Sequence, residues 1–71
     1  MELVNNLADF RKSAGLNQAD LGKLVGVSRQ TISLIERGDY NPSVTVALTI
    51  AKVLDVDINE IFRLEESNEE K

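Results

Sequence analysis

Apolar residues recur at helical spacing along most of the chain, and short polar or glycine-containing segments divide this pattern into five parts. Each part follows a residue whose side chain can accept an N–H bond from the first turn of a helix. These candidate N-caps are Asn5 or Asn6, Asn17, Ser28, Ser43 and Asp57. The pattern therefore predicts five helices, of which the last is short.

The stretch from Gln18 to Ser43 contains two of these helices, joined by only Gly26, Val27 and Ser28. Gly26 can end the first helix at positive φ, and Ser28 can cap the second. A connection this short forces a steep crossing, and Gly22 lies where the two backbones must approach. The spacing is that of a helix-turn-helix. A tight helical hairpin in a small bundle is the alternative.

Both helices of this pair are amphipathic. In the first, Leu21, Leu24 and Val25 lie at positions i, i+3 and i+4, which share one face. In the second, Ile32 and Ile35 turn inward. Elsewhere in the chain, Phe10 and Phe62 are expected in the core.

The outward face of the second helix carries side chains suited to reading DNA. With the isoleucines inward, Arg29, Gln30 and Ser33 point outward near its N-terminal end, and Thr31 lies to the side. Arginine pairs bidentately with guanine and glutamine with adenine in the major groove. Leu34 can offer only an apolar contact, for example to a thymine methyl group. These five residues are the predicted base contacts.

The combined motifs resemble those of the Cro/CI-type (XRE-like) helix-turn-helix regulators, in particular the short stand-alone ones. The matching stretches cover roughly residues 5–64 and read LNQADL, VGVSRQTISLIERG, YNPS and IAKVLxV, extending to INEIF. The resemblance implies an all-α, five-helix, phage-repressor-like domain whose third helix enters the major groove. In some short relatives the two ends of the domain pair as a small β ribbon, and Leu3 or Val4 beside Leu64 would suit that arrangement.

The resemblance also implies roles for residues around the recognition helix. Arg11 would form an ion pair with Glu36, where the alternative is a solvated surface charge. Gln18 would contact a phosphate and brace the recognition helix. The loop after that helix would lie along the DNA backbone, which adds four phosphate candidates: Arg37, Tyr40, Asn41 and Ser43. The Tyr40 ring could instead pack over the loop, and Ser43 is also the cap of the fourth helix.

The fourth helix, Val44 to Leu54, is apolar except for a narrow stripe formed by Thr45, Thr49 and Lys52. A helix this apolar is central in the fold, covered by a second subunit, or both. The candidate dimer contacts come from this helix and the residues after it: Val46, Leu48, Val53, Val56 and Leu64.

The net charge of −4 is unexpected for a protein that meets a polyanion. Residues 1–43 carry five basic and five acidic groups, whereas residues 44–71 carry three basic and seven acidic ones. We therefore expect a DNA-binding domain at 1–65 whose acidic end lies away from DNA, followed by an acidic flexible tail at 66–71. A neutral reading domain should bind non-specific DNA weakly, with a modest salt dependence.

Other function classes find little support. The chain has no cysteine or histidine, which excludes disulfides and the usual zinc sites. It has no phosphate-cradling glycine loop and its carboxylates are scattered, so we expect neither an enzyme nor a cofactor. No apolar run approaches the ~18 residues of a membrane span, and nothing resembles a signal peptide. A cytoplasmic protein is expected.

The sequence therefore predicts a DNA-binding transcriptional regulator, a repressor that binds a palindromic operator as a homodimer. The alternative is an antitoxin or protein-interaction module whose acidic C-terminal region holds a partner protein.

Overall fold

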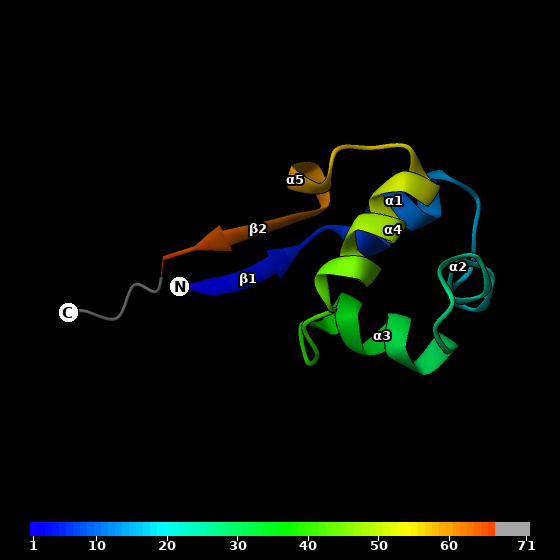
Figure 1. Ribbon diagram of the computed structural model, residues 1–71, viewed down its shortest axis with the longest axis horizontal. Coiled ribbons are helices and arrows are strands. Elements are labelled where there is room, and N and C mark those ends of the chain that lie inside the picture. Colours follow the sequence, from blue (N-terminus) through cyan, green and yellow to red (C-terminus); the bar gives the residue numbers. More distant parts are fainter. Residues whose placement is uncertain (67–71) are drawn as a thin grey trace.

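The computed structural model describes residues 1–66 of the 71-residue chain. Five helices surround the core and a two-stranded ribbon projects from them (Figure 1). The elements are β1 (Glu2–Asn5), α1 (Leu7–Ser13), α2 (Gln18–Val25), α3 (Arg29–Arg37), α4 (Val44–Leu54), α5 (Ile58–Ile61) and β2 (Phe62–Glu65). The five-helix prediction is confirmed. Except for Glu66, the tail predicted at 66–71 lies outside the described residues.

Side-chain caps begin four of the helices, α2 to α5, where the sequence predicted them. The carboxamide oxygen of Asn17 accepts from the Asp20 N–H at 2.7 Å, and the hydroxyls of Ser28 and Ser43 accept in the same way at 3.0 and 3.1 Å. Asp57 caps α5 by accepting from the Asn59 N–H at 3.3 Å. These bonds satisfy backbone donors that have no partner within the helix, so the caps fix where each helix begins.

The core consists of nine buried apolar residues contributed by all five helices and β2: Leu7, Leu21, Ile32, Ile35, Ala47, Ile50, Ala51, Ile61 and Phe62. Phe10 is half-buried and packs against this cluster. Leu24, which the helical spacing grouped with Leu21 and Val25, is instead 56% exposed. The buried side of α2 runs through Leu21 and Gly22, and this rotation of the packed face leaves Leu24 in solvent.

The ribbon joins the two ends of the described chain. β1 and β2 are antiparallel, and Leu3 lies opposite Leu64, which confirms the expected ribbon. The Asn6 N–H continues the link by donating to the Ile61 carbonyl at 2.8 Å. A two-stranded ribbon is marginal by itself. Here buried Phe62 ties its inner end to the helical core.

Among the described residues, no helix is both long and apolar enough to cross a membrane.

The turn between α4 and α5 contains the one non-glycine residue with positive φ in the described chain, Asp55 at φ 59°. Asp55 ends α4 in the left-handed conformation, which costs an L-residue free energy and also places a negative charge at a helix C-terminus. Replacing Asp55 with Gly should raise the free energy of unfolding by about 0.5–1 kcal/mol. Urea denaturation measures this change.

Gly38→Ala is the matched control, because Gly38 ends α3 at φ 80° and a Cβ there would meet no atom within 4 Å. That variant should lose about 1–2 kcal/mol from backbone strain alone. A loss of stability in Asp55→Gly would contradict the assignment of strain to Asp55.

Candidate nucleic-acid interface

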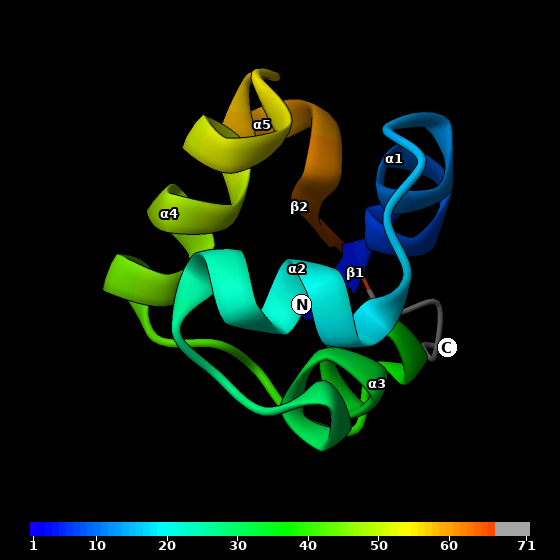
Figure 2. The same ribbon diagram turned by 90° about the vertical axis from the view of Figure 1, so that its right-hand side faces the viewer.

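The position of α3 depends on a close approach of two backbones. A Cβ built on Gly22 would lie 2.6 Å from the Val27 carbonyl oxygen and 3.3 Å from backbone atoms of Ser28. Gly26 ends α2 at φ 92°, and half-buried Val27 packs at the corner. Figure 2 shows α2 lying across α3, which is seen nearly end-on. The steep crossing expected for a helix-turn-helix is therefore present, and only glycine fits at its closest point.

A buried carboxylate anchors the last turn of α3. Glu36 accepts two bonds from the Arg11 guanidinium, at 2.7 Å from Nε to Oε2 and 3.3 Å from Nη2 to Oε1. Gln18 Nε2 donates to Oε1 at 3.0 Å, and Arg11 Nη1 donates to the Leu16 carbonyl at 2.9 Å. The Arg11 and Glu36 side chains are only 11% and 8% exposed. This network ties α1 and α2 to α3 and keeps the Glu36 charge away from the surface.

The side of α3 that is turned away from buried Ile32 and Ile35 carries the candidate base contacts. Arg29 and Gln30 are exposed at its N-terminal end, whereas Ser33 and Leu34 are half-buried. Gln30, Ser33, Leu34 and Arg37 line a shallow hollow along the helix. The Thr31 hydroxyl lies 3.0 Å from the Ser28 hydroxyl at the start of the helix. Three of the five candidates therefore share one accessible strip with Arg37. Arg29 is exposed at the start of the helix, and Thr31 takes part in the cap.

The phosphate candidates lie at the start of α2, at the last residue of α3 and on the segment that follows α3. Arg37 pairs with Asp39 at 3.2 Å, and both side chains are 60% exposed, so the pair is weak and can be exchanged for another anion. Tyr40 and Asn41 are exposed on the following loop, and Ser43 caps α4. Gln18 uses one amide hydrogen on Glu36, which leaves its second hydrogen for an outside acceptor.

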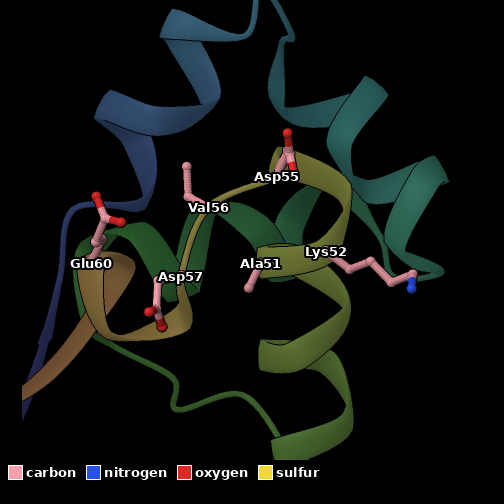
Figure 3. A pocket seen from close by; sticks show the side chains of 6 residues that line it. All are labelled: Ala51, Lys52, Asp55, Val56, Asp57 and Glu60. Carbon is pink, nitrogen blue, oxygen red and sulfur yellow. The ribbon is translucent and has the colours of Figure 1, made fainter.

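The acidic groups of the turn between α4 and α5 lie far from α3. Asp55, Asp57 and Glu60 surround a hollow at this turn, and the Lys52 side chain extends away from Asp57 and Glu60 (Figure 3). In both ribbon views α5 and α3 lie at opposite ends of the helical body (Figures 1 and 2). A duplex bound along α3 would therefore not face these carboxylates.

The candidate dimer residues divide into two groups. Val46, Val53 and Val56 are half-buried and pack against the core. Leu48 and Leu64 are 53% and 63% exposed. Val44, one helical turn before Leu48, is also exposed and was not among the predicted dimer contacts. The exposed stripe of α4 is therefore partly apolar.

Another residue missed in the sequence contacts α3. The Asn5 side chain in β1 donates from Nδ2 to the Ile35 carbonyl at 2.9 Å. The helical pattern identified Asn5 only as a candidate cap. A contact between residues thirty positions apart leaves no local sequence signal.

The sequence of this chain is similar to a known protein family and to individual proteins. The helix-turn-helix family HTH_3 matches residues 7–61. The HTH-type transcriptional regulator YgzD of Bacillus subtilis is 44% identical over 66 residues, which cover 93% of this chain and 100% of the relative.

Two solved structures are similar to this chain in both fold and sequence. The restriction-modification controller protein C.AhdI of Aeromonas hydrophila matches with a TM-score of 0.71 and 35% identity, over 76% of this chain and 78% of that one. The P22 c2 repressor, solved with a synthetic operator, matches with a TM-score of 0.72 and 36% identity, over 75% of this chain and 80% of that one.

Replacing Arg11 with Met should lower the free energy of unfolding by about 3–5 kcal/mol, because Glu36 would remain buried without its cation. Urea denaturation at neutral pH measures the loss. Arg37→Met is the matched control, since it breaks the exposed pair with Asp39 and should cost less than about 1 kcal/mol. Equal small losses in both variants would show that the buried pair does not anchor α3.

Proposed function

This chain belongs to the helix-turn-helix family HTH_3 of DNA-binding transcriptional regulators, and on that basis we propose that it represses transcription by occupying an inverted-repeat operator as a homodimer. In this proposal α3 enters the major groove. The protein would act by occupancy, competing with RNA polymerase for a promoter.

The arrangement of α3 carries the proposal. Its last turn is fixed by the Arg11, Gln18 and Glu36 network, while Arg29 and Gln30 at its other end are free in solvent. Arginine and glutamine at the N-terminal end of an inserted helix can pair bidentately with guanine and adenine. Ser33 and Leu34 would lie against the neighbouring base edges. A fixed helix with such side chains is suited to reading sequence.

Neutral and exchangeable donors would hold the duplex backbone. Gln18 offers an amide hydrogen before α3, and Arg37, Tyr40 and Asn41 lie after it. Phosphate contacts of this kind set the register of the protein on DNA without reading sequence. The P22 c2 repressor, a structural neighbour, was solved with an operator bound, which supports a DNA-facing role for the same fold here.

Dimer formation follows from the energy that one domain can supply. Each good bidentate pair discriminates by about 1–3 kcal/mol, which is too little for one α3 to select a unique site. A two-fold dimer would double this free energy by placing a second α3 about 34 Å away on the same face of the duplex. Exposed Leu48 and Leu64, with Val44, are the apolar side chains that a second copy would cover.

Selection of bound sequences from a random duplex pool tests this function, and Gln30→Ala should relax the preferred base at one position in each half-site. Gln18→Ala should weaken all sites by a similar factor and leave the preferred sequence unchanged, because it removes a phosphate donor. The enriched unmodified sequence should be an inverted repeat with half-sites about one helical turn apart. An unchanged preference in Gln30→Ala would show that α3 is not the reading helix.

If the unmodified protein enriched no sequence and its DNA binding disappeared with salt, the protein-interaction alternative would replace this proposal.

Leu48→Lys combined with Leu64→Lys should shift the protein from dimer to monomer, because the change places charge where apolar side chains would be buried together. Sedimentation velocity over a range of concentrations measures the shift. Leu24→Lys is the matched control, since Leu24 is similarly exposed but lies on α2, outside the candidate interface. If the double variant remained a dimer, the interface would lie elsewhere. Loss of the dimer in Leu24→Lys alone would place it on α2.

A further inference from the structure

We infer that Asn5 is a positioning residue for DNA reading, because its side-chain amide fixes the C-terminal end of α3 to the terminal ribbon. This inference rests on the proposed function, in which α3 reads base edges. It assigns part of the reading geometry to a residue that would not touch DNA.

Both ends of the Asn5 amide are engaged. Nδ2 donates to the Ile35 carbonyl at 2.9 Å, and Oδ1 accepts from the Leu7 N–H at 3.0 Å. A flipped amide would set its oxygen against the carbonyl and its NH2 group against the N–H, so only one orientation satisfies both partners. Asn5 is also the last residue of β1 and pairs with Phe62 of β2. The side chain therefore joins the ribbon, the start of α1 and the end of α3.

The Ile35 carbonyl that accepts the Asn5 bond lies in the last turn of α3. Ile35 is buried, and its carbonyl also accepts from the Gly38 N–H at 3.0 Å where the helix ends. The next residue, Glu36, is held by α1 and α2. Two consecutive residues of α3 are thus fixed by three different elements, and the orientation of the helix is set at this end.

The Asn5 bond joins β1 directly to α3 beside a hollow that otherwise lies between the two elements. A hollow separates β1 from the end of α3, with Leu3 and Val4 on one side and Arg37 and Gly38 on the other. Within residues 1–66, no other side-chain hydrogen bond joins β1 to α3. Loss of the Asn5 amide would therefore release this side of the helix.

A small rotation at this end is magnified at the reading end. Arg29 lies six residues before Ile35, which corresponds to about 9 Å along a helix at 1.5 Å per residue. A tilt of about 10° would move the Arg29 backbone by about 1.5 Å. Bidentate hydrogen bonds to a base tolerate shifts of only about 0.5 Å, so this tilt would lower sequence discrimination more than general attraction to DNA.

The test uses two substitutions at Asn5 and one at its neighbour. Asn5→Asp keeps the acceptor for the Leu7 N–H and replaces the donor with an oxygen, whereas Asn5→Ala removes both bonds without adding charge. Asn6→Ala is the matched control, because Asn6 Nδ2 donates to the Glu60 carbonyl at 3.4 Å and not to α3. Circular dichroism fixes a temperature at which all four proteins are folded.

Dissociation constants are then measured for the selected operator and for a scrambled duplex of equal length. Asn5→Ala should weaken operator binding about two- to tenfold, as expected for one hydrogen bond, and Asn5→Asp about tenfold or more. Binding to the scrambled duplex should change less than about threefold in either variant, which reports any general effect of the added charge. Asn6→Ala should leave both constants within about twofold.

Acidification gives a second readout that a purely structural role would not produce. Once protonated, the introduced carboxyl of Asn5→Asp can donate to the Ile35 carbonyl again. Its operator binding relative to the unmodified protein should therefore recover between about pH 8 and about pH 5, because burial beside a carbonyl raises the pKa of a carboxyl. Glu2, Glu36 and Arg37 line the same hollow in both proteins, so the ratio compares two proteins that have the same neighbouring charged residues.

An equal loss of operator and scrambled binding in both Asn5 variants, or no loss in either, would overturn the inference while leaving the proposed function intact. If Asn5→Asp did not fold, Asn5→Ala would decide alone, since it adds no charge. If the unmodified protein selected no operator, the proposed function itself would fail and this inference with it.

Discussion

The Glu36 carboxylate is the group on which the arrangement of this small domain depends. It is nearly excluded from solvent, so its charge must be matched inside the protein. Arg11 of α1 supplies the opposite charge, and the neutral amide of Gln18 in α2 donates a further hydrogen bond. The bonds require α1, α2 and the last turn of α3 to meet at one point. Because the anchoring is concentrated at that end, the outer face of the first two turns of α3 needs few internal contacts. Arg29 and Gln30 on these turns are exposed to solvent.

The charge distribution complements this division within α3. The part of the chain around the helix-turn-helix carries no net charge, and the carboxylates near the α4–α5 turn lie at the other end of the helical body. Such a domain attracts a polyanion weakly at long range, so its binding has to come from a few placed donors. Weak general attraction is useful to a sequence reader, because it lowers competition from the excess of non-specific DNA.

Local chemistry in the sequence predicted much of this fold, and contacts between distant residues account for what it missed. Ser28 and Ser43 predict helix starts, because an N-cap bond joins residues only three positions apart. The spacing of Gly22 and Gly26 predicts the helix crossing. The Leu3 and Leu64 pairing came from family resemblance and not from the residues themselves. Leu24 was grouped with the buried residues because helical spacing locates the buried face of a helix only to within about one residue. The close backbone approach at Gly22 determines how α2 is rotated about its axis, and this rotation leaves Leu24 exposed. The base and phosphate contacts remain predictions.

Asn5 shows why such contacts escape a reading of the sequence. Its cap-like character is local and was visible, since asparagine before a helix commonly accepts an N–H bond. Its second bond, to Ile35, exists only because β1 pairs with β2 and this pairing carries the start of the chain alongside α3. The ribbon, which would be marginal alone, is stable because Phe62 is buried at its inner end. Through Asn5 that stability is passed to α3, so the ends of the domain and the helix proposed to read DNA form one mechanical unit.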